Sequence, residues 1–307
     1  MRESTTITTR KAITRPPEIL GEAMMPGVEK VYGLLAVLLP WEAMQAGFMQ
    51  RAFLALLLLA PMCAAMGILV VNFRMAFFSD AISHSAFTGV ALGVLFQVDP
   101  RLTLIGFGLL VGLAITRMKH HSELSMDTII GVFFATAIAL GIAIISAQKG
   151  LTRNLQSFLY GDILTISDSD ILWAALLFLV VMGFAAFSYN RLLFVGLSEP
   201  MAHAYGVRVK AYEYLFAAVL SLVVLFGIRA VGILLVTALL VVPAAAARNV
   251  ARNAGGVFWW TLGFALFSSV AGLFTSVRWD SATGATVILF AAACFFLTAL
   301  YGSFARR

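Results

Sequence analysis

The sequence predicts an all-α membrane protein with eight or nine transmembrane helices. Hydrophobic residues make up 61% of the 307 residues and charged residues only 12%, whereas soluble domains carry about 25% charged residues. The apolar residues also gather in stretches that approach the ~20 residues a helix needs to cross a bilayer. We therefore expect a multi-pass membrane protein.

Nine apolar stretches follow one another along the chain, and each is a candidate span. The stretch at 52–71 is the clearest, because it contains no charged residue. Those at 102–116 and 214–228 are close to the lower length limit, which leaves the number at eight or nine. Aromatic residues lie near several ends, as in the aromatic belts of membrane proteins. The stretches are 52–71, 80–98, 102–116, 128–147, 171–189, 214–228, 231–247, 257–277 and 283–304.

The sequence divides into a polar tail at 1–30, expected to be disordered, and a transmembrane domain at 31–307. Within that domain the piece at 31–44 is apolar but is interrupted by Pro40 and Glu42. It is too short to cross the hydrocarbon, so an interfacial helix is expected there. The spans then run from about 52 to 304.

Basic residues indicate orientation here and not nucleic-acid binding, because Lys and Arg concentrate in the cytoplasmic loops of membrane proteins. Alternate loops carry unequal numbers of them, so the richer set is predicted to be cytoplasmic, which places the N-terminal tail outside. The richer set is Arg74, Arg117, Lys119, Arg191, Arg208, Lys210, Arg248, Arg252, Arg306 and Arg307. The poorer set is Arg101, Lys149, Arg153, Arg229 and Arg278.

A polar segment at 79–93 interrupts the apolar pattern and carries the candidate metal ligands. Asp80 and His84 stand four residues apart, so on a helix they share one face. Carboxylate oxygen and imidazole nitrogen suit zinc, manganese or iron(II), and ionisable groups within a membrane usually mark an ion path. Asp80 as a helix N-terminal acid and His84 as a buried, hydrogen-bonded histidine remain the alternative. Gly89 and Gly93 form a small-residue step that admits close packing of another helix.

A second segment, at 198–206, predicts a short cytoplasmic helix. Ser198 is a good helix cap, an acid and a proline follow in the first turn, and Gly206 provides a stop. Either this helix is a plain connector or it docks against a cytoplasmic partner. Its residues are Ser198, Glu199, Pro200, Met201, Ala202, His203, Ala204, Tyr205 and Gly206.

Several chemistries are excluded or disfavoured by the residues present. The chain lacks a Gly-x-x-x-x-Gly-Lys-Ser/Thr phosphate loop, so it is not expected to hydrolyse ATP. A hydrolase using Ser83 or Ser85 with His84 is disfavoured, because adjacent helical residues point about 100° apart. The two cysteines lie in apolar runs and offer neither a disulfide framework nor a thiolate metal site. We therefore expect neither catalysis nor a bound cofactor.

His120 and His121 form a pair beside two basic residues in a predicted loop. They could bind a metal ion as it leaves the path. Exposed loop residues are the commoner explanation for such a pair.

Five separated landmarks resemble the permease subunits of zinc, manganese and iron ABC importers, the ABC-3 family. The first is 74–84 together with 89–93, and the resemblance extends from about residue 45 to the end. The other landmarks, in chain order, are 126–131, 159–164, 199–202 with 205–207, and 229–232 followed by 243–245. The sequence departs from the family pattern at Ser79, Thr88 and Ser198, where Gly, Pro and Asp are common.

The resemblance implies the architecture of type II ABC importers and a set of partners. The permease would form a homodimer, or pair with a paralogous permease, in the lipid bilayer. A cytoplasmic ABC ATPase dimer would use ATP, and an external solute-binding protein would deliver the metal. The family likeness associates Asp80 and His84 with the translocated cation, and the 198–206 segment with the helix that couples to the ATPase.

One chain offers a single Asp–His pair, which is too few ligands for a strong cation site. Two copies meeting through the small faces of their helices would supply two of each, a plausible four-ligand set for zinc or manganese. The alternatives are a permease for a metal chelate, such as a siderophore or cobalamin, and an ATP-independent secondary transporter. The sequence leaves the choice among zinc, manganese and iron open.

Overall fold

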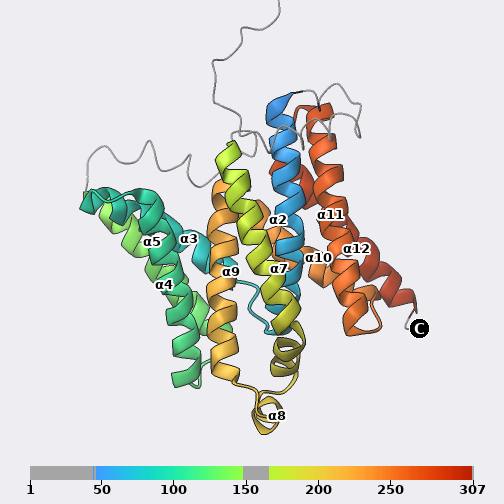
Figure 1. The fold of residues 1–307 in the computed structure, drawn as a ribbon, viewed down its shortest axis with the longest axis horizontal. Helices are drawn as coiled ribbons and strands as arrows, with labels where there is room; N and C mark the ends of the chain where they lie inside the picture. The colour runs from blue at the N-terminus through green and yellow to red at the C-terminus, as the bar shows by residue number, and fades with distance from the viewer. Residues whose placement is uncertain (1–43, 45, 148–165, 306–307) are drawn as a thin grey trace, which may run out of the picture.

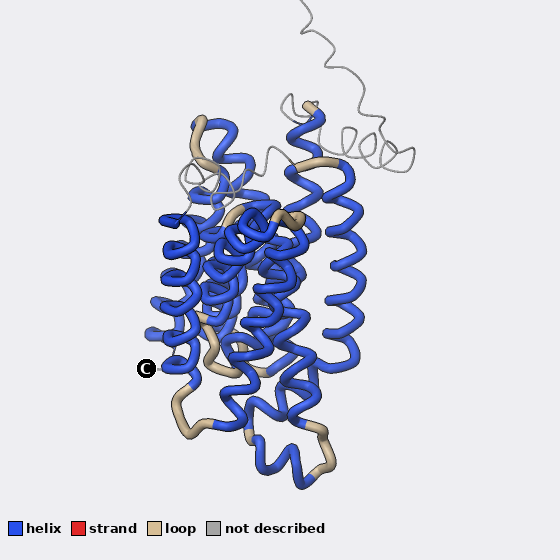
Figure 2. The backbone as a smooth tube through the Cα atoms, turned by 90° about the vertical axis from the view of Figure 1, so that its left-hand side faces the viewer, coloured by secondary structure: helices blue, strands red, loops and turns tan. Residues whose placement is uncertain are grey.

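A computed structural model describes residue 44, residues 46–147 and residues 166–305. Ten helices run through this part of the chain, and no strand interrupts them there (Figures 1 and 2). The predicted tail at 1–30 and the landmark at 159–164 lie outside the described residues, as does nearly all of the interfacial helix at 31–44. The helices are α2 (Gly47–Asn72), α3 (Phe78–Phe96), α4 (Pro100–His121), α5 (Met126–Ala147), α7 (Asp168–Leu197), α8 (Glu199–Ala204), α9 (Val209–Val231), α10 (Ile233–Val250), α11 (Ala254–Trp279) and α12 (Thr283–Ala305).

The predicted all-α, polytopic architecture is confirmed. Eight of the described helices are long and apolar enough to cross a membrane: α2, α4, α5, α7, α9, α10, α11 and α12. Helix α3 has 19 residues but is not among these eight, and its serines together with Asp80 and His84 interrupt its apolar residues. The count of eight or nine therefore depends on the helix that carries the candidate metal ligands.

Several helices extend beyond their predicted spans, and the predicted long loop at 190–213 is largely helical. Helix α7 continues to Leu197, α8 follows after Ser198, and α9 begins at Val209. The predicted spans end where charged residues begin. A helix can continue past the hydrocarbon, because its backbone hydrogen bonds remain satisfied in water as well as in lipid.

Helix α2 lies at the centre of one group of helices, and α3 belongs to a second group beside it. Helix α2 is the most buried of the eight candidate spans and packs against α7, α10 and α11. Helix α3 packs mainly against α4 and α5, which occupy one side of the bundle in Figure 1. Helix α9 contacts both α3 and α4, and it also touches α2 and α10. It therefore joins the two groups.

Polar contacts define two ends of the bundle. At one end, which we call the α8 end, Asn72 of α2 donates to Leu193 O of α7 and accepts from Arg248 of α10. At the opposite end, two ion pairs form between other helix ends and the first turn of α7. They are Arg51 with Asp168 at 3.9 Å and Arg229 with Asp170 at 3.5 Å.

The two predicted sets of basic residues separate onto these two ends. Among the described residues, members of the richer set follow or precede the helix termini of the α8 end. The described members of the poorer set, Arg101, Arg229 and Arg278, lie toward the opposite end together with Arg51. Under the positive-inside rule, this distribution supports a cytoplasmic α8 end.

Candidate functional site

The fold places Asp80 and His84 on the one accessible face of an otherwise buried helical segment. A turn at 73–77 leads from α2 into α3, and Asp80 lies in the first turn of α3. Both side chains are partly accessible. Between residues 81 and 91, every residue other than His84 and Phe87 is buried. Positions 80, 84 and 87 lie on one face of the helix, so the two candidate ligands are accessible from the same side of α3.

Helix α5 provides the neighbour of this face. The His84 ring meets the ring of Phe134 edge to face, with centroids 4.9 Å apart. The exposed Val132 and Leu140 of α5, at 58% and 42% exposure, lie about 200° and 240° around that helix from Phe134 and therefore on its far face. Within the described residues no group of three or more His, Cys, Asp or Glu could hold a metal ion. Among the described residues, Asp80 and His84 therefore offer two ligands on one partly accessible face of α3.

The small-residue step of α3 faces α4 of the same chain. A Cβ at Gly89 would lie 2.8 Å from the Leu104 Cα, and one at Gly93 would press on Thr103 and Pro100. Gly89 and Gly93 do lie against a close helix, and that helix is α4. The expectation that two copies meet through this small face is wrong, because α4 already covers it. Five residues on a helix turn the direction by about 140°, so Gly89 and His84 cannot share a face.

Two positions that depart from the family pattern have structural roles beside this site. Ser79 is fully buried, and its hydroxyl donates to Ala76 O within the turn that precedes α3. Thr88 donates to Ala137 O of α5 at 2.5 Å. This bond joins α3 to α5 one turn beyond His84, so Thr88 helps to fix the helix that bears the candidate ligands.

The short helix predicted at 198–206 is α8. Ser198 caps it by accepting from Met201 N, and Gly206 follows with φ +75°, a backbone conformation that strongly favours glycine. Ala202 is fully buried against Val195 and Val209. In contrast, Met201 and Tyr205, four residues apart, are 53% and 74% exposed. Helix α8, which lies at one end of the bundle in Figure 1, is thus anchored through Ala202 and presents an exposed apolar pair.

A polar cluster at the α8 end was missed by the sequence reading. Lys119 of α4 donates to Glu213 of α9 at 2.5 Å and lies 3.8 Å from Glu199 of α8. His120 is not the exposed loop residue that was expected. Its side chain is 6% exposed in the last turn of α4, and its Nε2 lies 3.0 Å from the second Glu213 oxygen. His121 is exposed, as expected, and bonds back to Arg117 O.

The signal that could have found this cluster was the apolar pattern after residue 208. That pattern continues through Glu213 into the span, so the acid lies in a helix and not in a loop. Glu213 is 5% exposed. A carboxylate buried to that extent needs a partner, but only the tertiary structure identifies Lys119 as that partner.

Comparison with known proteins identifies the fold and the transport class. The ABC 3 transport family matches residues 45–302. The chain belongs to this family.

Two curated relatives and one solved structure are similar over most of their length. The high-affinity zinc uptake system membrane protein ZnuB of Haemophilus influenzae is 29% identical over 247 residues, covering 80% of this chain and 95% of the relative. The manganese transport system membrane protein MntC of Listeria innocua is 30% identical over 258 residues, covering 84% and 92%. PsaBC from Streptococcus pneumoniae in complex with Fab aligns with a TM-score of 0.70 at 31% identity, covering 82% of this chain and 91% of that one.

Membership of the ABC 3 transport family confirms the predicted class. The chain is a non-catalytic, multi-pass membrane subunit of an ABC transport system, which implies ATPase and binding-protein partners. One family landmark also has a direct structural explanation. Gly232, which ends the 229–232 landmark, lies between α9 and α10 with φ +88° and ψ 163°. This region of backbone space is essentially restricted to glycine.

Proposed function

We propose that this chain is the membrane permease of an ABC importer for zinc or manganese, with iron(II) as a further candidate. Asp80 and His84 are proposed to contribute two ligands per copy to a cation site that a second copy completes. The observation that carries the proposal is the accessible Asp80–His84 face on an otherwise buried segment of α3.

The ligand chemistry favours a site shared between two copies. One carboxylate and one imidazole leave a divalent cation under-coordinated, whereas two of each match the four-coordinate nitrogen and oxygen sets of zinc. Manganese accepts the same donors. The partly accessible face of α3 that carries Asp80, His84 and Phe87 would then face the second copy, in place of the small face around Gly89. A homodimer satisfies this arrangement most simply, and a paralogous permease with the same pair would also do so.

Helix α8 is proposed to dock into the ATPase subunit. Ala202 holds the helix on the bundle, so a push on its outer face would be transmitted inward. Met201 and Tyr205 project from that face as an exposed apolar pair of the kind that anchors a helix in a groove. The ABC family match disfavours an ATP-independent transporter. A chelate permease would need a broad path in place of an Asp–His pair.

The test is metal uptake into proteoliposomes that contain the permease with its ATPase and binding protein. The Asp80→Asn/His84→Gln variant should lower the initial uptake rate of Mn²⁺ and Zn²⁺ by more than about tenfold, because it removes ligands and not merely their supporting shell. Competition among Mn²⁺, Zn²⁺ and Fe²⁺ on the wild type then identifies the preferred cation.

The matched control is Asp280→Asn/His121→Gln, which makes the same two changes of residue type away from α3. His121 is exposed at the α8 end. Asp280 ends α11 in the left-handed region, which Asn also tolerates. This control should transport at the wild-type rate. Wild-type uptake by the Asp80→Asn/His84→Gln variant would refute the proposed site.

A further inference from the structure

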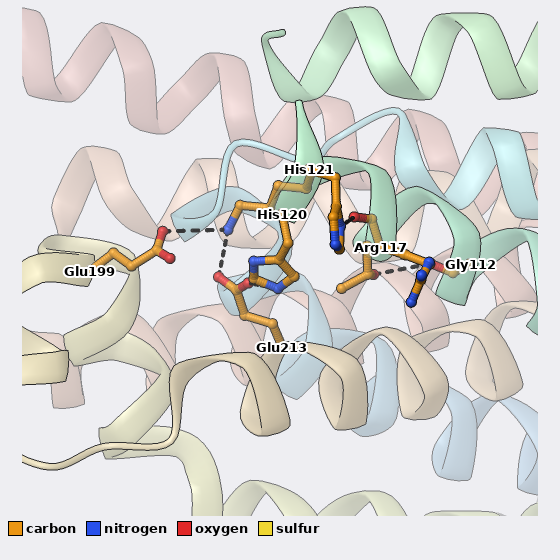
Figure 3. A network of polar contacts seen from close by, with 8 residues as sticks. Gly112, Arg117, His120, His121, Glu199 and Glu213 are labelled. Carbon is orange, nitrogen blue, oxygen red and sulfur yellow. Dashed lines mark hydrogen bonds and ion pairs between the residues drawn. The ribbon is translucent and has the colours of Figure 1, made fainter. Parts of the chain in front are cut away.

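The charged cluster at the α8 end joins three helices through one ammonium group. Glu199 of α8 and Glu213 of α9 converge on that group, which belongs to Lys119 of α4 (Figure 3). The two Nζ–oxygen distances are 3.8 Å to Glu199 and 2.5 Å to Glu213. The cluster therefore connects the proposed docking helix directly to α4.

The contacts of Glu213 with its neighbours are buried, whereas the contact of Glu199 with Lys119 is exposed to solvent. The Glu213 side chain is 6% exposed and has Lys119 on one oxygen and His120 near the other. Breaking such a buried pair by removing one partner is costly, so Lys119 stays with Glu213. Glu199 has a 43% exposed side chain, and its contact with Lys119 can lengthen or shorten as α8 moves.

Lys119 also contacts the segment that leads into α3. Its ammonium lies 5.9 Å from the centroid of the Phe73 ring, a distance at which a cation and an aromatic face attract. Phe73 caps the C-terminus of α2, seven residues before Asp80, and packs against the cluster that contains Ala202 of α8. The same short turn thus packs on the apolar cluster that anchors α8 and meets Lys119 through a cation–π contact.

Helix α4 forms the second connection to the candidate ligands. It packs along α3 more extensively than any other helix does, and the backbones approach closely at Gly89. At such a contact α4 cannot shift without moving α3, because no side chain intervenes to absorb the displacement. A displacement of Lys119 would therefore reach Asp80 and His84 both through the turn at 73–77 and through α4.

We propose that Lys119 is a positioning residue through which α8 sets the position of α3. When the proposed ATPase contact moves α8, Glu199 attracts the ammonium of Lys119. That ammonium is also held by Glu213 and Phe73. The turn at 73–77 and α4 then shift together, and the Asp80–His84 face shifts with them. This inference rests on the proposed function, because it presupposes that α8 docks to the ATPase and that α3 bears the metal ligands.

The cluster is better suited to this role than to binding the metal at the cytoplasmic end of its path. His120 and Glu213 supply only two ligands, and the Lys119 ammonium occupies the position beside the carboxylate that a cation would need. Within the described residues no group of three or more ligating side chains includes them. Coulomb repulsion from Lys119 would further weaken the binding of a divalent cation there.

The experiment measures cations transported per ATP hydrolysed in the reconstituted complex, using Mn²⁺ and Zn²⁺ as probes. Glu199→Gln removes the outer charge and leaves the buried pair intact. We expect it to lower this ratio by about threefold or more, the lower part of the range for residues that carry coupling between sites, with assembly of the complex unchanged. Glu123→Gln is the matched control, because Glu123 is exposed between α4 and α5. It should keep the wild-type ratio.

A double-mutant cycle separates a relay from a merely structural contact. The Lys119→Met/Glu213→Gln variant replaces the buried pair by neutral groups of similar size, so folding should be preserved. In this background, adding Glu199→Gln should change the transport ratio no further. Additive effects would show that Glu199 acts independently of Lys119 and would overturn the inference, as would a wild-type ratio in Glu199→Gln.

Failure of this inference is distinguishable from failure of the proposed function. If the chain does not carry these metals, the wild-type complex transports neither cation. If only the relay is wrong, the wild type and Glu199→Gln both transport with the same ratio, while the uptake rate of Asp80→Asn/His84→Gln is still lowered.

Discussion

The contact between α2 and α10 provides the sharpest test of the packing. At Gly67 of α2, an added Cβ would overlap the backbone carbonyl oxygen of Leu240 in α10. A backbone carbonyl inside a helix cannot rotate away, so the two helices would have to separate. We therefore expect Gly67→Ala to destabilise the protein although alanine is the better helix former.

The expected magnitude follows from two opposing terms. Overpacking of a well-packed interface costs about 1–3 kcal/mol, and a rigid backbone neighbour places Gly67→Ala at the upper end of that range. Replacing glycine by alanine within a helix stabilises that helix by up to about 1 kcal/mol. The net loss is therefore about 2 kcal/mol. By the size scaling of soluble domains, this lowers the Tm of a 307-residue chain by about 3 °C.

The two native cysteines supply the assay. Cys63 on α2 is fully buried and Cys294 on α12 is 9% exposed, so a thiol-reactive fluorogenic maleimide reports their exposure as detergent-solubilised protein is heated. Gly263→Ala on α11 is the matched control, because a Cβ there meets nothing within 4 Å. Its Tm should equal or exceed that of the wild type. A Gly67→Ala protein as stable as the Gly263→Ala protein would refute the packing argument.

Two further predictions concern the candidate site and α8. Thr88→Val removes the bond to Ala137 O and should cost about 0.6–1.7 kcal/mol, the range for interhelical hydrogen bonds in membranes. The same thermal assay would detect this as a lower Tm, and an unchanged Tm would contradict it. Ser198→Ala removes the cap of α8, worth about 1 kcal/mol to the helix, and should weaken ATPase binding by several-fold in a pull-down titration. Ser198→Asp keeps a capping oxygen and should bind as the wild type does; equal binding by all three proteins would argue against docking through α8.

The sequence was a good guide wherever a local pattern had a single physical solution. Long apolar stretches must be helices in a bilayer, since no other single segment satisfies its own backbone hydrogen bonds. Ser198, Pro200 and Gly206 predicted α8 because capping and positive φ depend on nearest neighbours. The i, i+4 spacing likewise placed Asp80 and His84 on one face of a helix.

The sequence misled where a side chain's partner lies far along the chain. The small face around Gly89 was assigned to a second copy, but α4 of the same chain covers it. His120 was expected in an exposed loop, but it is buried beside Glu213, 93 residues later. Neither contact leaves a local pattern, because small or charged residues signal only that something packs there.

The sequence by itself determined that this is a helical membrane protein, which helix carries the Asp–His pair, and where α8 begins and ends. These features follow from hydrophobicity, periodicity and capping, which act over a few residues. Only the tertiary structure decided which face of α3 stays open, which helix closes its small face, and that Lys119 links α8 to the turn preceding Asp80. Those features depend on how distant helices fill space against one another and pair buried charge, and no short stretch of sequence contains that information.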